Sequence, residues 1–371
     1  MNPELREWIW FANIKGIITR KKNELLELFG TPASIYEADA VALAKTGILN
    51  RENIDAILST ESRKAVDETM EKLALNNIDV ITQEDDAYPE LLKNIADPPV
   101  CLYVKGNLRR DEISIGVVGS RRASGYGLST TKKISSELAE YGICVISGMA
   151  RGIDTAAHQG ALSSGGRTIA VFGCGLDIVY PPENRRLMER IIENGAVVSE
   201  YPPGTIPAPH HFPVRNRIVS GMSIGVLVVE AGEKSGSLIT AQLALEQGRD
   251  VYALPGNVIS INSRGTNKLI QDGAKLVTSV HDIIDEIRWY NSFKKNIVVS
   301  LDDYRNRKKI PDSLDAEERK VMEILAVEPL QIDEIHSRLS IELQLLHRVL
   351  LSLEMKGLIK REAGGKYMIL V

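Results

Sequence analysis

The chain has 371 residues, of which 44% are hydrophobic and 25% charged, and its formal net charge at pH 7 is −4. Such a chain is long enough for two or three domains and apolar enough to build at least one sizeable core. The slightly acidic balance excludes a wholly cationic nucleic-acid- or membrane-binding protein, but local basic patches are compatible with it.

The N-terminus, the apolar runs and the cysteines together predict a soluble, cytoplasmic protein. The stretch MNPELREWIW carries Glu4 and Glu7 where a secretory signal would be basic. The longest apolar runs, such as IGVLVV, are far shorter than a membrane span. Cys101, Cys144 and Cys174 lie far apart in apolar segments without a CxxC pair, so we expect buried thiols in a reducing compartment.

Residues 1–80 are expected to form a small helical domain, because apolar residues recur at helical spacing in KKNELLELFG and NIDAILST. The segment IKGIITRKKNELLELFG is similar to a SAM-like or helix-hairpin-helix unit, whose glycine hairpin can hold a nucleic-acid phosphate. That hairpin usually has two glycines, whereas here Gly16 is followed by Ile17 and Ile18. We therefore interpret this region as a plain helical domain, with DNA contact as the alternative.

A second domain is predicted over residues 81–289, entered through a connector at 81–110. From ISIGVVGSRR onward, short β-branched runs alternate with helical stretches; the runs are ISIGVVG, GICVIS, RTIAVFG, AVVSE, IGVLVVE, DVYALPG and AKLVT. Near-continuous apolar strands between helices indicate an α/β fold with a doubly wound parallel sheet that is covered on both faces. Such sheets bind ligands beyond the carboxyl ends of their strands, where the strand order reverses.

Residues 290–310 are predicted to be a linker, and residues 311–371 a winged-helix domain. Three helical stretches are followed by LIKREAGGKYMILV, which is typical of a strand, an Ala-Gly-Gly turn and a second strand. From Pro311 to Val371 there are eight Lys or Arg and eleven Asp or Glu, so the domain is acidic, by about −3. Winged helices that read duplex DNA usually carry a basic face, so a protein-contact role is at least as well supported here.

Several predicted strand ends carry glycine, a small hydroxyl residue or a cation, which suits a phosphate. In VVGSRRAS, Arg121 is expected to hold a phosphate bidentately, whereas Arg122 fits a surface position. SGMARGIDTAAHQGAL places a glycine-bracketed loop before a helix, where unpaired backbone N–H groups attract anions. EAGEKSGSLITA has the composition of a phosphate cradle around Lys234 but lacks the Walker A spacing. Because such loops recur at one edge of the predicted sheet, they predict an extended phosphate-bearing ligand.

Other residues near these strand ends leave alternatives open. Tyr180 either stacks on a nucleobase or packs against the proline loop that follows it. Arg215 and Arg217 are expected to point in different directions, one toward the ligand and the other toward a carboxylate such as Glu200. The glycine spacing does not match G-x-G-x-x-G, so no dinucleotide cofactor is predicted. The pair His210–His211 has no neighbouring cysteine or other histidine, so no metal site is predicted either.

Catalytic machinery is not expected. Asp154 and His158 lie four residues apart like an acid/base pair, but the first helical turn and an alanine-rich helix suit structural roles for them. Glu200 and Glu230 stand at strand ends. Pairing of these carboxylates with Arg151, Arg215 or Arg217 would hold the loops rigid. No G-x-S-x-G nucleophile motif is present.

Six segments in order, over about residues 80–280, resemble the DNA-processing protein A (DprA, also Smf) family. They are GSRRAS, SGMARGIDTAAHQGAL, GCGLDIVYPPEN, SEYPPGTIPAPHHFPVRNRIVSG, VVEAGEKSGSLITAQLALEQGRDVYALPGN and GTNKLIQDGA. The resemblance implies an extended Rossmann core that binds single-stranded DNA without cutting it. It further implies a homodimer formed through that core, protection of incoming DNA during natural transformation, and loading of the RecA recombinase.

The family resemblance and the loops together define the predicted DNA-binding residues. The family's phosphate pocket carries over to Gly119–Arg121, to Gly148–Gly152 and to Lys234–Gly236, and its Arg-Asn-Arg signature to residues 215–217. The full predicted set is Gly119, Ser120, Arg121, Ser124, Gly148, Met149, Ala150, Arg151, Gly152, Gly173, Gly175, Tyr180, Asn184, Arg215, Asn216, Arg217, Lys234, Ser235, Gly236 and Ser237.

The competing hypotheses are an enzyme and a transcription regulator. Nucleotide phosphoribohydrolases have a similar core with a PGGxGT loop and a catalytic glutamate and arginine. The corresponding stretch EAGEKSGSLITA lacks the paired glycines and the following glutamate, which argues against this enzyme. A regulator that reads DNA through the winged helix is disfavoured by the acidic composition of that domain.

Overall fold

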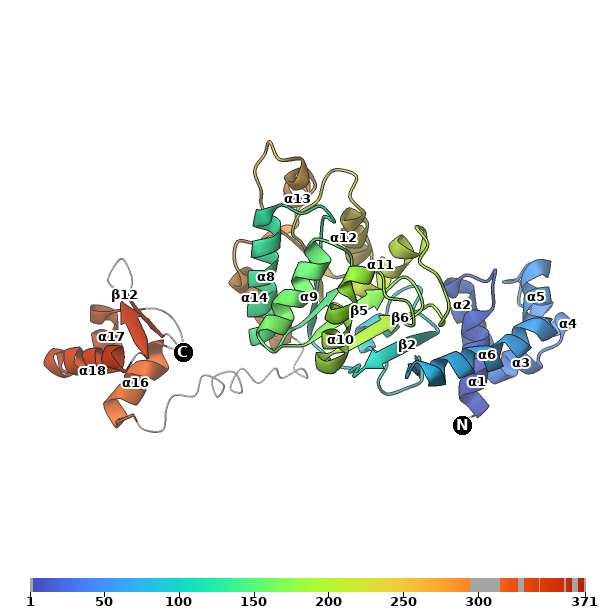
Figure 1. Ribbon diagram of the computed structural model, residues 1–371, viewed down its shortest axis with the longest axis horizontal. Coiled ribbons are helices and arrows are strands. Elements are labelled where there is room, and N and C mark those ends of the chain that lie inside the picture. Colours follow the sequence, from blue (N-terminus) through green and yellow to red (C-terminus); the bar gives the residue numbers. More distant parts are fainter. Residues whose placement is uncertain are drawn as a thin grey trace. The chain divides into compact units, whose positions relative to one another are not determined.

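The computed structural model describes residues 3–293, 314–325, 330–339, 341–356, 358–361 and 366–369 (Figure 1). It divides into two compact units, Met1–Tyr290 and Asn291–Val371. Helix α14 continues to Phe293, and the rest of the linker predicted at 290–310 lies outside the described residues, as does the Ala-Gly-Gly turn.

The first unit begins with a helical domain, as the helical spacing of its apolar residues predicted. Buried side chains at that spacing, among them Trp10, Phe11, Leu25 and Ile57, meet in its centre. Side-chain caps define several helix starts; the Asn50 side chain, for example, accepts the backbone N–H of Asn53. Its helices are α1 (Pro3–Asn13), α2 (Thr19–Phe29), α3 (Pro32–Glu37), α4 (Ala40–Lys45), α5 (Arg51–Leu58) and α6 (Thr60–Leu75).

A nine-stranded sheet, counted within the described residues, follows the helical domain in the same unit. Its order is β1-β2-β6-β5-β4-β3-β7-β8-β9, and the strands from β6 to β9 in this order are all parallel. The strands are β1 (Asp79–Thr82), β2 (Cys101–Gly106), β3 (Ser114–Val118), β4 (Cys144–Ser147), β5 (Thr168–Phe172), β6 (Ala196–Ser199), β7 (Gly225–Val228), β8 (Asp250–Ala253) and β9 (Lys275–Leu276). The prediction of an extended, doubly wound, mostly parallel sheet is confirmed.

The connector contains two strands that the sequence analysis did not identify. β2 pairs antiparallel with β6, and β1 pairs antiparallel with β2. The apolar run of β2 is buried on both faces, which gives this segment the burial of a central strand. These two strands, with α7 (Glu90–Lys93) between them, widen the sheet on the side that carries the helical domain.

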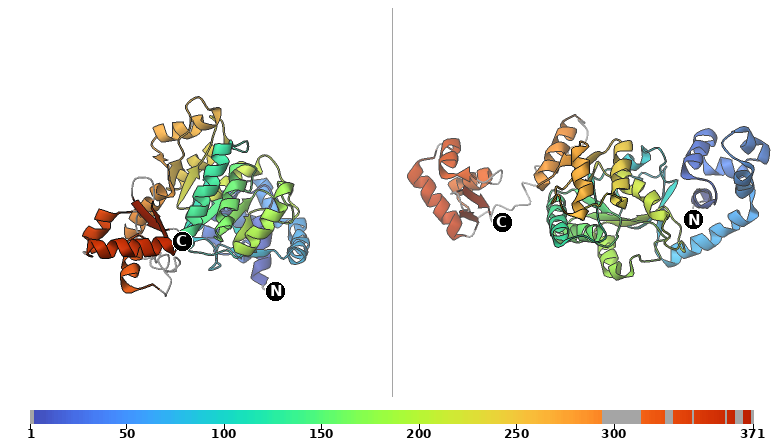
Figure 2. Two further views of the ribbon diagram at one scale, coloured as in Figure 1. Left: turned by 60° about the vertical axis from the view of Figure 1, so that its left-hand side comes forward. Right: turned by 90° about the horizontal axis from the view of Figure 1, so that it is seen from above.

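Helices cover both faces of the sheet (Figures 1 and 2). On one face lie α8 (Gly125–Glu140), α9 (Ile153–Ser163), α10 (Arg185–Asn194) and α14 (Val280–Phe293); on the other lie α7, α11 (His211–Gly221), α12 (Gly236–Glu246) and α13 (Arg264–Gln271). The chain leaves β3 toward β4 and returns from β6, through α11, to β7 on the other side of β3. The strand order therefore reverses between β3 and β7, so that a crevice opens beyond their carboxyl ends.

The second unit has the predicted winged-helix arrangement. Its sheet has the order β10-β12-β11, with antiparallel pairing, and buried residues such as Val321, Ile335, Leu346 and Leu353 form its core. Its elements are α16 (Ala316–Leu325), β10 (Leu330–Gln331), α17 (Ile332–Leu339), α18 (Leu343–Met355), β11 (Ile359–Arg361) and β12 (Lys366–Ile369). The short strand β10 is an element that the sequence pattern did not reveal.

Candidate nucleic-acid interface

A pocket of about 330 Å³ lies at the carboxyl ends of β3 and β7, where the strand order reverses. Four segments that are distant in the sequence line it: the loop after β3, the loop after β4, the start of α11 and the start of α12. The lining residues are Val118, Gly119, Ser120, Arg121, Ala150, Asp154, Pro209, Phe212, Pro213, Arg215, Asn216, Ser235, Gly236, Ser237, Ile239 and Thr240. Residues from four of the predicted loops are thus brought together at one place.

Glu230 fixes the loop between β3 and α8. Its backbone oxygen accepts the N–H of Ser120 at 2.8 Å, and its carboxylate accepts the Ser124 N–H at 2.9 Å and the Ser124 hydroxyl. A Cβ on Gly127 would lie 2.6 Å from the Glu230 carboxyl carbon, so a larger residue there would displace this carboxylate. The pairing of Glu230 with an arginine that the sequence suggested is absent from the described ion pairs, and the carboxylate instead accepts two hydrogen bonds from Ser124.

The loop between β4 and α9 packs directly on the loop after β3. Gly152 has a φ of 78°, and a Cβ there would stand 2.3 Å from the Ser120 carbonyl oxygen. That same carbonyl accepts the N–H of Ile153 at 3.2 Å. Only glycine permits this backbone-to-backbone approach, so the two loops form one continuous rim.

Asp154 braces this loop from behind, and His158 lies deeper. The Asp154 carboxylate accepts the Ala150 N–H at 3.2 Å; burial raises its pKa, and nearby Arg215 acts in the opposite direction. His158 is fully buried, its Nδ1 lies 2.7 Å from the Thr168 hydroxyl, and burial lowers its pKa to about 3. The imidazole is therefore neutral near pH 7, and each residue has a structural contact of its own.

Arg215 forms the buried floor of the pocket. Its Nη1 donates to the Gly148 carbonyl oxygen at 2.8 Å and also to the Val171 carbonyl oxygen. A Cβ on Gly148 would lie 2.5 Å from Arg215 Nη2, so the glycine makes room for the guanidinium. Burial lowers the pKa of Arg215, and its charge lies beneath the rim without reaching the solvent.

The outer edge of the pocket is cationic. Arg121 is exposed, and its guanidinium lies 5.4 Å from the centre of the Phe212 ring. Across the pocket, Ser235 caps α12 by accepting the Ser237 N–H at 3.4 Å, and Lys234 beside it is exposed. The first N–H groups of an 11-residue helix therefore face a pocket that also carries an exposed guanidinium, which is an arrangement that favours an anion.

Several predicted residues lie outside the pocket. Arg217 points away from Arg215, as expected for one of the two, and pairs with Glu200 at 2.7 Å and Asp97 at 2.9 Å. The Met149 side chain is fully buried in the apolar core. Asn184 is buried, and its amide nitrogen donates to the Met149 carbonyl oxygen at 3.1 Å. These three residues support the rim from inside the protein.

Three other predicted residues shape the neighbouring loop. Tyr180 packs on Phe212 of α11, with 5.5 Å between the ring centres, so its ring is engaged inside the protein, but with a partner other than the proline loop that was expected. The carbonyl oxygen of Gly173 lies 3.1 Å from His211 Nδ1, and the Gly175 N–H donates to the Thr205 carbonyl oxygen at 2.9 Å. They brace the proline-rich loop that brings α11 to the pocket.

Phe212, Pro209 and Pro213 were missed by the sequence analysis as pocket residues, as were Ile239 and Thr240. The first three belong to the proline-rich loop and the start of α11, directly before the Arg-Asn-Arg signature. Because they stand so close to Arg215 in the sequence, they could have been predicted to line the same pocket. Phe212 matters most, because its ring contacts both Arg121 and Arg215, at 5.4 and 5.9 Å from the ring centre.

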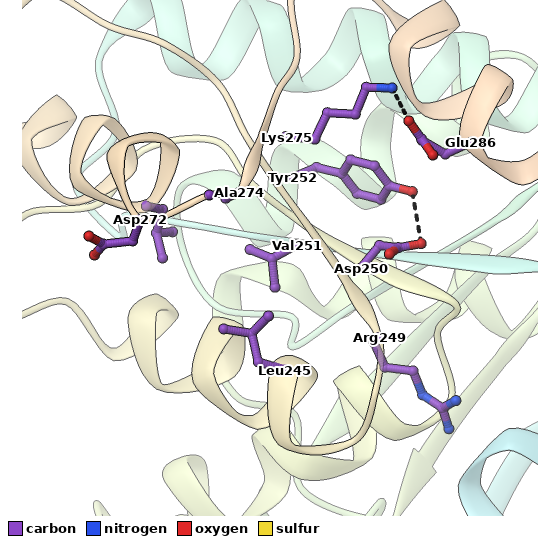
Figure 3. Close-up of a pocket in the computed structure, with 11 residues that line it drawn as sticks. Leu245, Arg249, Asp250, Val251, Tyr252, Asp272, Ala274, Lys275 and Glu286 are labelled. Carbon is purple, nitrogen blue, oxygen red and sulfur yellow. Dashed lines mark hydrogen bonds and ion pairs between the residues drawn. The ribbon is translucent and has the colours of Figure 1, made fainter.

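A second pocket, of about 340 Å³, lies toward the amino end of β8 (Figure 3). Lys275 forms an ion pair with Glu286, and the Tyr252 hydroxyl donates to Asp250 at 3.5 Å. Asp272, also in the lining, pairs with Lys268 at 2.8 Å. Arg249 also lines this pocket, but its guanidinium donates to the Leu91 carbonyl oxygen at 2.8 Å. Since Lys275 is paired and three carboxylates line it, this pocket is poorly suited to a phosphate.

No cluster of three or more His, Cys, Asp or Glu side chains that suits a metal ion occurs within the described residues. In the same ranges, no helix is both long and apolar enough to cross a membrane. Cys101, Cys144 and Cys174 are buried free thiols, as predicted, and burial raises the pKa of Cys174 to about 11.

Together, the doubly wound sheet and the cationic pocket at its reversal point define an α/β protein with a candidate anion-binding site. Comparison with family models refines this class, since residues 79–288 match the model described as DNA recombination-mediator protein A, and residues 306–365 match the DprA winged helix domain. The chain belongs to the DNA recombination-mediator protein A (DprA/Smf) family.

Curated relatives and solved structures agree with this assignment. The Synechocystis Protein Smf is 32% identical over 99% of both chains, and the Streptococcus pneumoniae DNA processing protein DprA is 49% identical over 55% of this chain and 73% of that protein. The X-ray structure of the S. pneumoniae protein covers 76% of this chain and 97% of its own, with 39% identity and a TM-score of 0.67. A structure of DNA processing protein A from Helicobacter pylori, described in terms of its single-stranded DNA binding mode, covers 57% of this chain and 97% of its own, with 30% identity and a TM-score of 0.51.

Proposed function

We propose that this chain binds single-stranded DNA without cutting it and holds successive phosphates along the rim that carries the pocket. The observation that carries the proposal is the convergence of an exposed guanidinium, Arg121, with the N-terminal amides of α12 at the reversal point. Phosphate contacts of this kind are largely independent of sequence. The relative from H. pylori, described as binding single-stranded DNA, supports the same ligand class.

The rim is suited to an extended ligand because it continues beyond one pocket. In the spatial order of the sheet, β7, β3, β4 and β5 are neighbours. The loops after the first three carry Lys234, Arg121 and Arg151, and Arg185 begins α10, the helix that follows β5. Neighbouring strands lie about 4.8 Å apart, so these three spacings span roughly 14 Å. This length accommodates more than one phosphate of a DNA strand.

A fluorescence-anisotropy titration with a labelled oligo-dT at 50 mM salt tests this proposal. We expect saturable binding that weakens steeply as the salt concentration rises, and little preference for base composition. The absence of binding at low salt would overturn the proposal. Recovery of the oligonucleotide at full length after incubation tests whether it is left uncut.

The assembly and the partner recombinase belong to the same proposal. We infer that the protein is a homodimer in solution, assembled through the Rossmann-like core, and that it acts in the cytoplasm during natural transformation by loading RecA onto the bound strand. Light scattering should give twice the 40.9 kDa mass of one chain. Loading predicts faster RecA filament growth on single-stranded DNA, and an unchanged growth rate would contradict this part of the proposal.

The enzyme alternative is less well supported by the site. A phosphoribohydrolase-like reaction needs an available glutamate, whereas both carboxylate oxygens of Glu230 accept hydrogen bonds from Ser124. Incubation with nucleoside monophosphates should therefore release no free base. Turnover that disappears in the Glu230→Ala variant would favour the enzyme over the binding protein.

A further inference from the structure

Arg151 lies on the rim, but its guanidinium is already occupied. It forms a two-point ion pair with Glu183, in which Nε donates to Oε1 and Nη2 donates to Oε2 at 3.1 Å. Both side chains are solvent-accessible, with exposed fractions of 58% for Arg151 and 50% for Glu183. By contrast, Arg121 next to it has no carboxylate partner among the described residues.

The carboxylate of Glu183 is held in place by its neighbours. Glu183 is the central residue of the 3₁₀ turn η1 (Pro182–Asn184). The buried Asn184 ties this turn to the loop that carries Arg151, because its amide donates to the Met149 carbonyl oxygen at 3.1 Å and to the Thr155 hydroxyl at 2.9 Å. The turn and the loop therefore keep the two charges within reach of each other.

The position of Arg151 adjoins the pocket. Its neighbour Ala150 is a lining residue, and Gly152 on its other side packs on the Ser120 carbonyl. A strand whose phosphate lies in the Arg121 pocket would thus pass close to the Arg151 guanidinium. At this point of the rim the protein presents its own anion in place of a bound one.

We propose that Glu183 is a built-in phosphate mimic, which holds Arg151 in the DNA-free protein and is displaced by a DNA phosphate, so that Arg151 forms a second phosphate subsite beside the Arg121 pocket. Carboxylate and phosphate both accept the parallel N–H pair of a guanidinium, so either anion fits the same fork. The inference rests on the proposed single-stranded DNA binding.

The exchange is feasible because the ion pair is exposed. Solvent-exposed ion pairs favour the paired state by about 1.4- to 5-fold in equilibrium terms. A phosphate that adds contacts elsewhere on the rim can therefore displace Glu183. Removing the negative charge of Glu183 should tighten DNA binding by about two- to fivefold at low salt, because Arg151 is then free before the strand arrives.

The test compares oligo-dT affinities at 50 mM salt for the wild-type protein, Glu183→Gln, Arg151→Gln and the double variant. Glu189→Gln is the matched control, because it makes the same charge change at an exposed position on α10. We expect tighter binding for Glu183→Gln and wild-type affinity for Glu189→Gln. Arg151→Gln should weaken binding and reduce the slope of log affinity against log salt by about 0.7. The double variant should match Arg151→Gln.

Three results would overturn the inference while leaving the proposed function intact. They are equal affinities of Glu183→Gln and Glu189→Gln, a gain that persists in the Arg151→Gln background, and weaker binding by Glu183→Gln. The last result would mean that Glu183 positions Arg151 for DNA and does not compete with it. If the wild-type protein itself binds no oligo-dT, the proposed function fails, and this inference fails with it.

Discussion

Removal of the Arg121 guanidinium is the most informative single change on the rim. In Arg121→Ala, the pocket loses an exposed cation that contacts the Phe212 ring and that has no carboxylate partner among the described residues. It forms no ion pair within that part of the protein, although the Asp154 carboxylate lies close enough to interact with it, so its charge should act on the ligand. The other lining arginine, Arg215, remains in the variant and continues to bind backbone carbonyl oxygens.

The expected loss of affinity and of salt dependence in Arg121→Ala corresponds to the loss of one phosphate contact. One phosphate contact with single-stranded DNA contributes about 0.7 to the slope of log affinity against log salt. From 50 to 200 mM salt, that contact alone accounts for about a 2.6-fold loss of affinity. Arg121→Ala should therefore bind more weakly than the wild type at 50 mM, roughly tenfold, and lose about 2.6-fold less affinity across this salt range.

Anisotropy titrations of oligo-dT at four or more salt concentrations measure both quantities. Arg121→Lys should keep a slope near that of the wild type but bind more weakly, because an ammonium lacks the bidentate fork. Arg122→Ala is the matched control, since Arg122 is exposed but does not line the pocket, and it should behave like the wild type. A wild-type slope in Arg121→Ala would refute the assignment of a phosphate to this guanidinium.

Three further predictions concern the framework of the site. Gly152→Ala should lower the free energy of unfolding by about 2–4 kcal/mol in urea titrations, because of its positive φ and the 2.3 Å approach of a Cβ to the Ser120 carbonyl oxygen. Gly125→Ala is the control, because a Cβ there meets nothing within 4 Å, and equal effects of the two variants would contradict the packing argument. Burial lowers the pKa of Lys22 to about 8, so the folded state binds fewer protons than the unfolded chain between pH 8 and 10.5. The free energy of unfolding of the wild type relative to Lys22→Met should therefore rise by about 2 kcal/mol from pH 8 to 10. A difference that does not change with pH would count against this burial cost. Burial lowers the pKa of His158 to about 3, so the unfolded chain takes up a proton before the folded state does as the pH falls from 6.5 toward 3. Thermal unfolding should therefore show a loss of stability over this range in the wild type but not in His158→Asn. Parallel pH curves for the two proteins would disprove this linkage.

The strands and loops of the core were predictable from the sequence because their signals are local. Apolar runs between amphipathic helices indicated the parallel sheet, and glycine with small hydroxyl residues after each run indicated anion-binding loops. The opposite orientation of Arg215 and Arg217 followed from their spacing of two on a helix. The structure confirms this, since Arg215 lines the pocket and Arg217 pairs with Glu200.

The remaining features depend on contacts between distant segments, which no local pattern reveals. β2 was not identified as a strand because its partner, β6, follows about ninety residues later in the chain. The same limit applies to Glu230, whose carboxylate reaches Ser124, and to Arg151, whose partner Glu183 is supplied by another loop. In each case the residue type was noticed, but its partner was set by the tertiary fold.

The helical domain and the core are joined by polar contacts at two places. The Thr19 hydroxyl donates to Glu200 at 3.0 Å, and Glu200 in turn accepts from Arg217 of α11 at 2.7 Å. Asn13 of α1 and Tyr103 of β2 form a further hydrogen bond at 2.9 Å. The first of these contacts reaches the helix that also carries Arg215.

The most direct test of the account is a crystal structure of the protein with a bound dT oligonucleotide. We predict a phosphate in the pocket, with its oxygens within hydrogen-bonding distance of the Arg121 guanidinium and the first N–H groups of α12. The next phosphate should lie beside Arg151. A strand bound on another face, with the pocket between β3 and β7 left empty, would contradict the central claim.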